Sequence, residues 1–461
     1  MDYFRKKIIS NNGSQEKHLA QCLSGFDLVL MGVGAIVGAG IFVLTGIVAA
    51  TQAGPAIILC YLVAGLACAF SALSYAELAS TVGGSGSAYG YAYAGFGELL
   101  AWIVGWDLIL EYAIAVSTVS VGWSGYCNDL LKSLSINLPI DFLCAPAAGG
   151  IMNSLATSII LLLTLLLALG AKTSVRFNNT MVFVKLSVIA LFIVIASLHV
   201  NPQNWTPFMP FGWEGIMDGA ALIFFGYIGF DAVSTAAEEA IDPQRDLPIG
   251  IMGSLIVCTL LYMIVSGLLT GIVPYSTLNG SSPISSAMLQ LGYQAAAGLI
   301  GVGAIAGLTT VMLVMFYGLS RVFFAMARDG LLPSYFSRIN SYTQTPARII
   351  IGSGIVMALI AGFLPMQDLA ELVNIGTLFA FITVCLGVIW LRYTQPKLLR
   401  PFKTPLMPWV PLLGVLSCGY LIIHLPRITL IRFVVWMAIG FVVYFTYSRH
   451  ASGLNPQKKI K

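Results

Sequence analysis

Three ionisable side chains lie deep inside long apolar stretches, where a charge is costly. Lys185 stands eight residues into the run from 177 to 200, about 12 Å from its start at about 1.5 Å per residue. If the run crosses a membrane, burial disfavours the charged form of this lysine, which makes it a candidate for proton exchange. The alternative is that its long stem reaches back to the cytoplasmic headgroups.

Asp107 and Glu111 are the other two such side chains. They are four residues apart and therefore share one face of a helix. Glu111 is the deeper of the two, and it either serves a proton path or fixes its helix to a neighbouring backbone. Asp231 is a fourth acidic residue of interest, because it directly follows a glycine-rich segment and is expected to cap or orient unwound backbone there.

Two glycine clusters interrupt apolar runs near their middles, GAIVGAGIF at 34–42 and FFGYIGFD at 224–231. Glycine lets the chain leave helical geometry without steric cost. Unpaired backbone at membrane depth is tolerated only where it is buried in protein or lines a cavity. Each break therefore predicts a cavity. The alternative is close helix packing, because Gly34 and Gly38 have the spacing of small residues at helix contacts.

The two predicted breaks offer opposite chemistry. At Gly38, Ala39 and Gly40 the following half-helix presents free N–H groups and the positive end of its dipole, which suit a carboxylate. Freed carbonyls near Phe225, Gly226 and Ile228 can accept hydrogen bonds from an ammonium group. The pair of breaks predicts a site for a small zwitterion such as an amino acid.

No enzyme chemistry is predicted. The four histidines (18, 199, 424 and 450) all fall at the ends of apolar runs or in the tails, so no catalytic cluster can be built from them. The eight cysteines contain no C-x-x-C pair, and no metal or cofactor is expected. Cys127 and Cys144 lie in one predicted external loop and are the candidate pair for a disulfide.

These residues require a membrane to position them. The chain of 461 residues is 58% hydrophobic and only 9% charged, whereas soluble proteins carry about 25% charged residues. The apolar runs predict an all-α membrane protein with twelve transmembrane helices. They are 26–50, 54–80, 97–126, 152–169, 177–200, 216–239, 248–273, 293–327, 347–364, 369–392, 408–424 and 430–447.

The interrupted spans, the first and the sixth, are five spans apart, as an inverted repeat of five helices plus five requires. The spacing is compatible with two repeats, at about 26–200 and 216–392, although the internal sequence similarity is too weak to prove a duplication. The segments 1–25 and 449–461 are expected to be cytoplasmic tails. The first of them has no apolar core that would make it a cleavable signal peptide.

Basic residues set the orientation. With both termini inside, the external side receives only Lys132, Arg427 and Arg432, and Lys185 lies within a span. The remaining 19 of the 23 basic residues then face the cytoplasm, which agrees with the excess of Lys and Arg in cytoplasmic loops. Their arrangement predicts no nucleic-acid surface.

Several segments together resemble the amino acid-polyamine-organocation superfamily, and within it the bacterial form of the cationic amino acid transporter family. They are GVGAIVGAGIFVLTG at 32–46, SGSAYGYAYAGFGELLAWIVGWDLILEY at 85–112, IFFGYIGFDAVSTAAEE at 223–239, DPQRDLPIGI at 242–251 and ARDGLLP at 327–333. The resemblance runs from about residue 24 to 448. It implies the broken-helix transporter fold, with a ten-helix core of five plus five helices at 26–392, two added peripheral helices at 393–448, and alternating access.

The resemblance also implies roles for single residues. The N–H groups around Ala39 and Gly40 would hold the substrate carboxylate, and the carbonyl of Ile36 would join those of Phe225, Gly226 and Ile228 at its ammonium group. Phe230 would act as a lid above the pocket. Proton-coupled relatives have a lysine at the position of Lys185, in the volume that sodium fills in sodium-coupled relatives. Sodium dependence is therefore not expected, although Thr309 and Thr310 remain an alternative cation site.

This chain departs from its relatives at two positions. Ala39 replaces a frequent Ser or Thr, so a hydroxyl contact to the carboxylate is missing. Gly226 replaces a frequent Ala and should leave more room. Met315 would face the substrate side chain and should disfavour a long cationic one, although methionine on a membrane helix is more often simple packing.

We therefore expect a secondary active permease of the bacterial cytoplasmic (inner) membrane that takes up neutral or broad-range L-amino acids with protons. Lys185 and Glu111 are the coupling candidates, and H⁺ is the expected coupling ion. Cationic amino acid or polyamine transport in the same fold is the alternative, and a channel is not expected. The expected partners are the amino acid and the lipid bilayer, with room for a small accessory membrane subunit.

Overall fold

A computed structural model describes residues 23–82, 87–133, 136, 138–280, 282–340, 343, 345–364, 366–423 and 425–454. Within this part of the chain the secondary structure is helical, apart from one isolated bridge between Leu23 and Ala240. The α-helices are α1 (Gly25–Ile36), α2 (Thr45–Val48), α3 (Ile57–Val82), α4 (Ala88–Gly95), α5 (Glu98–Ser133), α6 (Ser154–Ala168), α7 (Ala171–Ser197), α8 (Gly212–Ile223), α9 (Pro243–Ile272), α10 (Pro283–Gln290), α11 (Gln294–Arg328), α12 (Ala347–Phe363), α13 (Met366–Thr394), α14 (Trp409–Ile423), α15 (Arg427–Val443) and α16 (Arg449–Ala451).

Local sequence signals explain where the first helices begin. Ser24 and Asp27 form a capping box at the start of α1, in which the Asp27 carboxylate accepts from the Ser24 N–H at 3.1 Å. Gly54 has a φ of +59°, and with Pro55 it turns the chain into α3. Two short helices, α4 and α10, lie in connections where no span was predicted.

The prediction of an all-helical membrane protein is confirmed. The described residues contain 8 apolar helical stretches long enough to cross a membrane, of which the first runs from Gly25 to Val82. Three shorter apolar helices, α6, α12 and α14, join them. Leu162, Leu165, Val434 and Val442 are among many apolar side chains that stay exposed on the outside, which suits a lipid surface rather than water.

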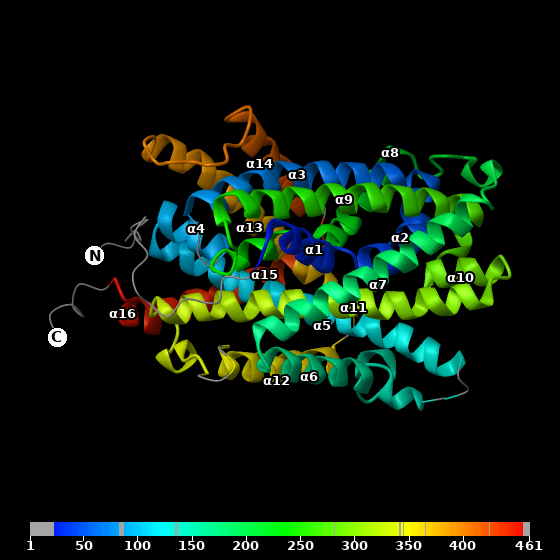
Figure 1. The fold of residues 1–461 in the computed structure, drawn as a ribbon, viewed down its shortest axis with the longest axis horizontal. Helices are drawn as coiled ribbons and strands as arrows, with labels where there is room; N and C mark the ends of the chain where they lie inside the picture. Colours follow the sequence, from blue (N-terminus) through cyan, green and yellow to red (C-terminus); the bar gives the residue numbers. More distant parts are fainter. Residues whose placement is uncertain are drawn as a thin grey trace.

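The long helices run roughly side by side along the longest axis of the molecule (Figure 1). The first helix, α1, lies near the middle, in contact with α7, α9 and α11. Helices α6 and α12 pack together on one side, and α14 packs against α3 and α13 on the other. The interrupted segments after α1 and α8 are therefore enclosed by other helices.

Burial follows this arrangement. Of the 18 most apolar consecutive residues in the stretch Gly25–Val82, 94% are buried inside the protein. In Arg427–Ala451 the corresponding share is 17%. Helices at the centre pack against protein on every side, whereas α15 has one covered face only. The segment that holds the first break is thus in the core.

The candidate disulfide between Cys127 and Cys144, which the sequence left open, is not formed in this structure. Cys127 and Cys144 are both free thiols in this structure, since Cys127 lies on α5 and Cys144 in a separate loop before α6. Residues 1–22 of the predicted N-terminal tail, residues 455–461 of the C-terminal tail and His424 lie outside the described residues.

Candidate functional site

The first membrane helix is broken, as predicted. Helix α1 ends at Ile36, and Val37 takes an extended conformation with a ψ of 94°. Helical geometry resumes at Ala39 and continues through a π-helical turn at Gly40–Leu44. The N–H groups of the first turn after a break lack intrahelical acceptors. The break lies at Val37 and Gly38, and Ala39 and Gly40 begin the next half-helix.

The sixth predicted span is broken as well. Helix α8 ends at Ile223, and a 3₁₀ turn follows at Phe224–Tyr227. Ile228 is extended with a ψ of 131°, and Gly229 has a φ of +124°, which only glycine adopts without strain. The chain then continues as a 3₁₀ helix at Asp231–Ala236 rather than as an α-helix.

The two breaks touch each other through glycines. A Cβ atom on Gly40 would lie 2.4 Å from the Cα of Gly226, and a Cβ on Gly226 would lie 3.0 Å from the Cα of Gly40. The extra room predicted at Gly226 is therefore not found in this conformation. The missing side chain instead lets two interrupted backbones approach each other closely.

Buried tyrosine hydroxyls donate hydrogen bonds to the carbonyl groups at these breaks. The hydroxyl of Tyr262 on α9 lies 2.6 Å from the carbonyl of Ile36 and 2.9 Å from that of Gly226. The hydroxyl of Tyr61 donates to the carbonyl of Gly40 at 3.0 Å. Two of the carbonyls predicted to hold an ammonium group thus share one donor. Sequence reasoning missed both tyrosines, although a polar hydroxyl inside an apolar span is a signal that finds them.

The carbonyl of Phe225 has a partner within the break itself, since it accepts from the N–H of Ile228 at 3.3 Å. Gly38 is held between helices, because a Cβ there would lie 2.4 Å from the side chain of Val311 on α11. Gly38 therefore serves close helix packing as well as the break, and the two interpretations of this glycine are compatible.

Lys185 points into the protein core and not toward the headgroups. Its side chain is fully buried. Its Nζ donates to the carbonyls of Val33, Gly34 and Val37 at 2.8 to 3.0 Å and to the hydroxyl of Thr310 at 2.9 Å. These carbonyls belong to the C-terminal end of α1, where the helix dipole favours a cation. The ammonium group caps the broken end of the first helix, and snorkelling is excluded.

The predicted acidic residues lie together between α5 and the second break. Asp107, Glu111 and Asp231 are buried, and the hydroxyl of Tyr112 donates to Asp231 at 2.5 Å. The oxygens of Asp107 and Glu111 have no hydrogen-bond partner among the described residues. Asp231 therefore fixes the second break to α5 through Tyr112, which sequence reasoning did not find.

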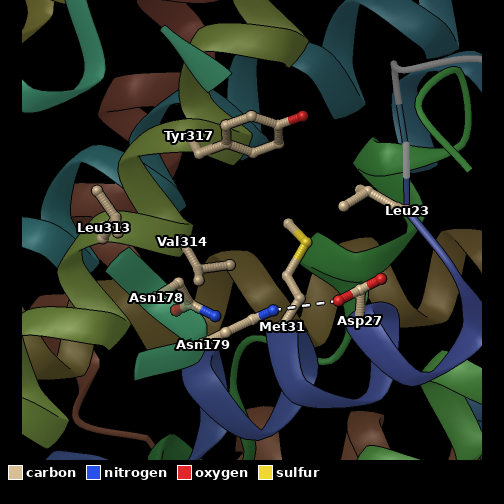
Figure 2. A pocket seen from close by; sticks show the side chains of 8 residues that line it. All are labelled: Leu23, Asp27, Met31, Asn178, Asn179, Leu313, Val314 and Tyr317. Atoms are coloured by element: carbon tan, nitrogen blue, oxygen red, sulfur yellow. Dashed lines mark hydrogen bonds between the residues drawn. The ribbon is translucent and has the colours of Figure 1, made fainter. Parts of the chain in front are cut away.

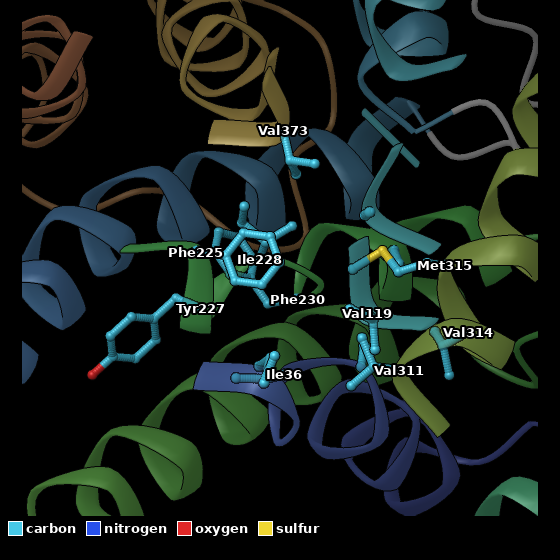
Figure 3. Packing of buried hydrophobic residues seen from close by; sticks show 14 of the residues in the cluster. Ile36, Val119, Phe225, Tyr227, Ile228, Phe230, Val311, Val314, Met315 and Val373 are labelled. Atoms are coloured by element: carbon cyan, nitrogen blue, oxygen red, sulfur yellow. The ribbon is translucent and has the colours of Figure 1, made fainter. Parts of the chain in front are cut away.

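Apolar side chains surround the second break (Figure 3). Phe230 is buried and packs against Tyr75 and Phe381, with ring centroids 5.9 and 4.9 Å apart. Met315 on α11 reaches the break, because a Cβ on Gly229 would lie 2.8 Å from its terminal methyl group. The structure brings Phe230 and Met315 to the same break, while their roles as lid and size filter stay predictions.

Comparison with known families identifies the protein family of this chain. The amino acid permease family matches residues 23–447, nearly the whole chain. The chain belongs to this family. The permease is accordingly an integral membrane transporter and not an enzyme, and both expectations are confirmed.

Two individual relatives match nearly the whole length of the permease, and a third matches most of it. It is 50% identical to the branched-chain amino acid permease BcaP of Bacillus subtilis (strain 168), over 98% of this chain and 99% of that one. It is 48% identical to the methylthioribose transporter of the same strain, with the same coverage. The cationic amino acid transporter 4, vacuolar, of Arabidopsis thaliana is 41% identical over 84% of this chain and 66% of its own.

Proposed function

We propose that this permease is a proton-coupled secondary transporter that takes up neutral amino acids by alternating access. The observation that carries the proposal is the position of Lys185. Its ammonium group binds the backbone at the break of the first helix, beside the predicted substrate site. A group that can carry a charge near neutral pH therefore contacts the segment that has to move.

The coupling follows from the chemistry of that contact. A protonated Lys185 neutralises the carbonyl end of α1 and holds the break in the conformation described here. Loss of its proton removes the charge and weakens three hydrogen bonds, so the end of α1 is released. Thr310 already binds the ammonium group, which leaves little support for a sodium ion at Thr309 and Thr310. Glu111, which is buried and for which the described part of the chain supplies no partner that meets the hydrogen-bond criteria, is the second proton-binding candidate.

The substrate backbone would bind between the two breaks. We assign its carboxylate to the N–H groups around Ala39 and Gly40, with Gly38 permitting the bend. We assign its ammonium group to the carbonyls of Ile36, Phe225, Gly226 and Ile228. Two of these, Ile36 and Gly226, already lie within hydrogen-bond distance of the Tyr262 hydroxyl. For the substrate to enter, Gly40 and Gly226 have to separate, and Phe230 then closes over it.

The substrate side chain should be apolar. Met315 and Phe230 present apolar surface at the second break, and the nearly full-length relative at 50% identity is named a branched-chain amino acid permease. Leucine, isoleucine and valine fit this surface. Arginine and polyamines would place a cation against Met315 and are disfavoured.

The architecture that we propose contains twelve spans. The stretch Gly25–Val82 turns at Gly54 and supplies two of them, and the three shorter apolar helices complete the set. The first ten spans (26–392) would form the inverted repeats, 26–200 and 216–392, and the last two (393–448) would be peripheral. Both tails, 1–25 and 449–461, would face the cytoplasm of a bacterium, with the chain in its inner membrane.

Methylthioribose transport is the second candidate function, because a relative of equal coverage carries that name at 48% identity. A methylthio sugar has no carboxylate and no ammonium group. It would use the break N–H groups and carbonyls for its hydroxyls and place its methylthio group against Met315.

Uptake into proteoliposomes separates these functions. The labelled solutes are leucine, valine, arginine, spermidine and methylthioribose, each tested with an imposed pH gradient and separately with a sodium gradient. The proposal expects leucine and valine to accumulate when the outside is acidic. Accumulation driven by sodium alone would refute proton coupling, and accumulation of methylthioribose without leucine would replace the substrate.

A further inference from the structure

A cavity lies between α1, α7 and α11, about two helical turns from Lys185 along α7. It is separate from the predicted substrate site. Figure 2 shows its lining, which includes Asp27, Met31, Asn178, Asn179, Val314 and Tyr317. Among its polar side chains, Asn179 of α7 and Asp27 of α1 point toward each other and form a hydrogen bond. The proposed substrate contacts use none of the six.

The residues that line the cavity and the residues that bind Lys185 lie on the same three helices, one or two turns apart. On α1, Met31 lies one turn before Gly34, whose carbonyl binds Lys185. On α11, Val314 lies one turn from Thr310, which binds Lys185 as well. On α7, Asn178 stands seven residues before Lys185, about 10 Å along the helix at about 1.5 Å per residue.

Gly34 lies next to both Lys185 and Asn178, a residue of the cavity lining. Its carbonyl accepts from Lys185 at 3.0 Å, and a Cβ on it would lie 2.7 Å from the Oδ1 of Asn178. The Asn178 side chain is buried, and its Oδ1 has no hydrogen-bond partner among the described residues. A buried amide oxygen without a partner is costly, and a water molecule in the cavity is the usual solution.

Asp27 stands at the other end of the cavity, two turns before Gly34 on α1. It is half-buried, and its Oδ1 accepts from the Nδ2 of Asn179 at 3.1 Å (Figure 2). Other charged groups approach from two sides. Asp246 of α9 lies beside Gly25, and Tyr317 of α11 bonds Glu239, which is paired with Arg321 at 2.7 Å. Arg321 is thus already paired with another carboxylate, and Arg176, one turn before Asn179 on α7, has an exposed side chain.

We propose that this cavity is the route by which the coupling proton leaves Lys185 for the cytoplasm, with Asp27 as the acceptor at its outer end. The N–H bond of the ammonium group breaks, and water beside Asn178 passes the proton to a carboxylate oxygen of Asp27, where an O–H bond forms. Lys185 is left as a neutral amine, and Asp27 then releases the proton to the cytoplasmic water. This inference rests on the proposed proton coupling through Lys185.

The variant Asp27→Asn isolates proton acceptance from structure. Asparagine keeps an oxygen for the Ser24 N–H, so the helix cap survives. The Asn179 amide can turn to accept from the new amide, because its own Oδ1 has no partner in the described structure. Asp242→Asn is the matched control, since Asp242 is an exposed carboxylate at the same end of the molecule.

The test uses the full chain in proteoliposomes that contain a pH-sensitive dye, with leucine added outside. Two rates are measured, namely leucine-driven proton arrival and the exchange of labelled for unlabelled leucine, which needs no net proton release. We expect Asp27→Asn to slow proton arrival about 10-fold or more, in the range of a lost proton-transfer group, and to leave exchange within about twofold. Asp27→Glu and Asp242→Asn should behave like the parent.

The other outcomes are distinct. If protons arrive at the parent rate in Asp27→Asn, the exit route is wrong. If proton arrival and leucine exchange fall equally, Asp27 acts only as the cap of α1 and not as a proton acceptor. A parent protein that exchanges leucine but moves no protons overturns the proposed coupling itself, and the exit route with it.

Discussion

The Nζ atom of Lys185 lies 2.8 Å from the carbonyl oxygen of Val37, the residue at which the first helix loses its helical geometry. This contact links a titratable group on α7 to the end of α1. Because an ammonium group in the membrane needs several acceptors to offset its desolvation, the conformation of the break and the charge of Lys185 depend on each other.

Removing the lysine should uncouple transport. Lys185→Ala deletes all four polar contacts of Nζ and the charge at the end of α1, so we expect the pH gradient to stop driving leucine accumulation while leucine exchange persists. The measurement is uptake into proteoliposomes with and without a pH gradient. Lys132→Ala, at the exposed end of α5, is the control. A Lys185→Ala protein that still concentrates leucine in response to the gradient would make the residue a structural anchor.

The contact between the two breaks should not tolerate a methyl group. Gly40→Ala places a Cβ 2.4 Å from the Cα of Gly226, and a backbone cannot yield as a side chain does. Overpacking of this kind costs about 1–3 kcal/mol. We expect a lower melting temperature in detergent and loss of uptake. Gly125→Ala adds the same methyl group on α5, where no atom of the described residues lies within 4 Å, and it should leave both unchanged. Equal behaviour of the two variants would contradict the close contact.

The size of the residue at position 315 should select the substrate side chain. Met315→Ser removes apolar volume beside Gly229, so we expect the variant to take up arginine, which the parent should exclude, and to take up leucine more weakly. Competition of each solute against labelled leucine measures the change. Met326→Ser, on the same helix but packed against Gly105, controls for general destabilisation. Arginine uptake by the parent protein would remove the proposed filter.

The hydrogen bond from Tyr112 to Asp231 should stabilise the second break. Tyr112→Phe leaves a buried carboxyl group without its 2.5 Å partner, which costs about 1–3 kcal/mol. The matched variant is Tyr75→Phe, because the hydroxyl of Tyr75 has no partner among the described residues. Thermal unfolding of the two purified variants should show a loss of stability for Tyr112→Phe only. Equal melting temperatures would show that Asp231 does not depend on this bond.

Much of the fold could be predicted because lipid leaves few solutions. An apolar chain in a bilayer has to satisfy its backbone within helices, so the apolar runs already predict the helical class and the approximate spans. Glycines near the middle of two runs predict the breaks, and the structure moves the first of them only to Val37 and Gly38. The question of a disulfide could not be answered from the sequence, because it depends on the geometry that places Cys127 on α5 and Cys144 in the loop before α6.

What only the tertiary structure decided is which groups meet. The sequence alone determined that Lys185 lies within a span, but its acceptors come from α1 and α11, far away along the chain. Tyr262, Tyr61 and Tyr112 looked like ordinary residues of apolar helices, and the fold turned them into partners of the two breaks. The physical reason is that periodicity and composition report how each helix meets lipid or protein, whereas hydrogen bonds between helices depend on their rotation and depth, which only packing sets.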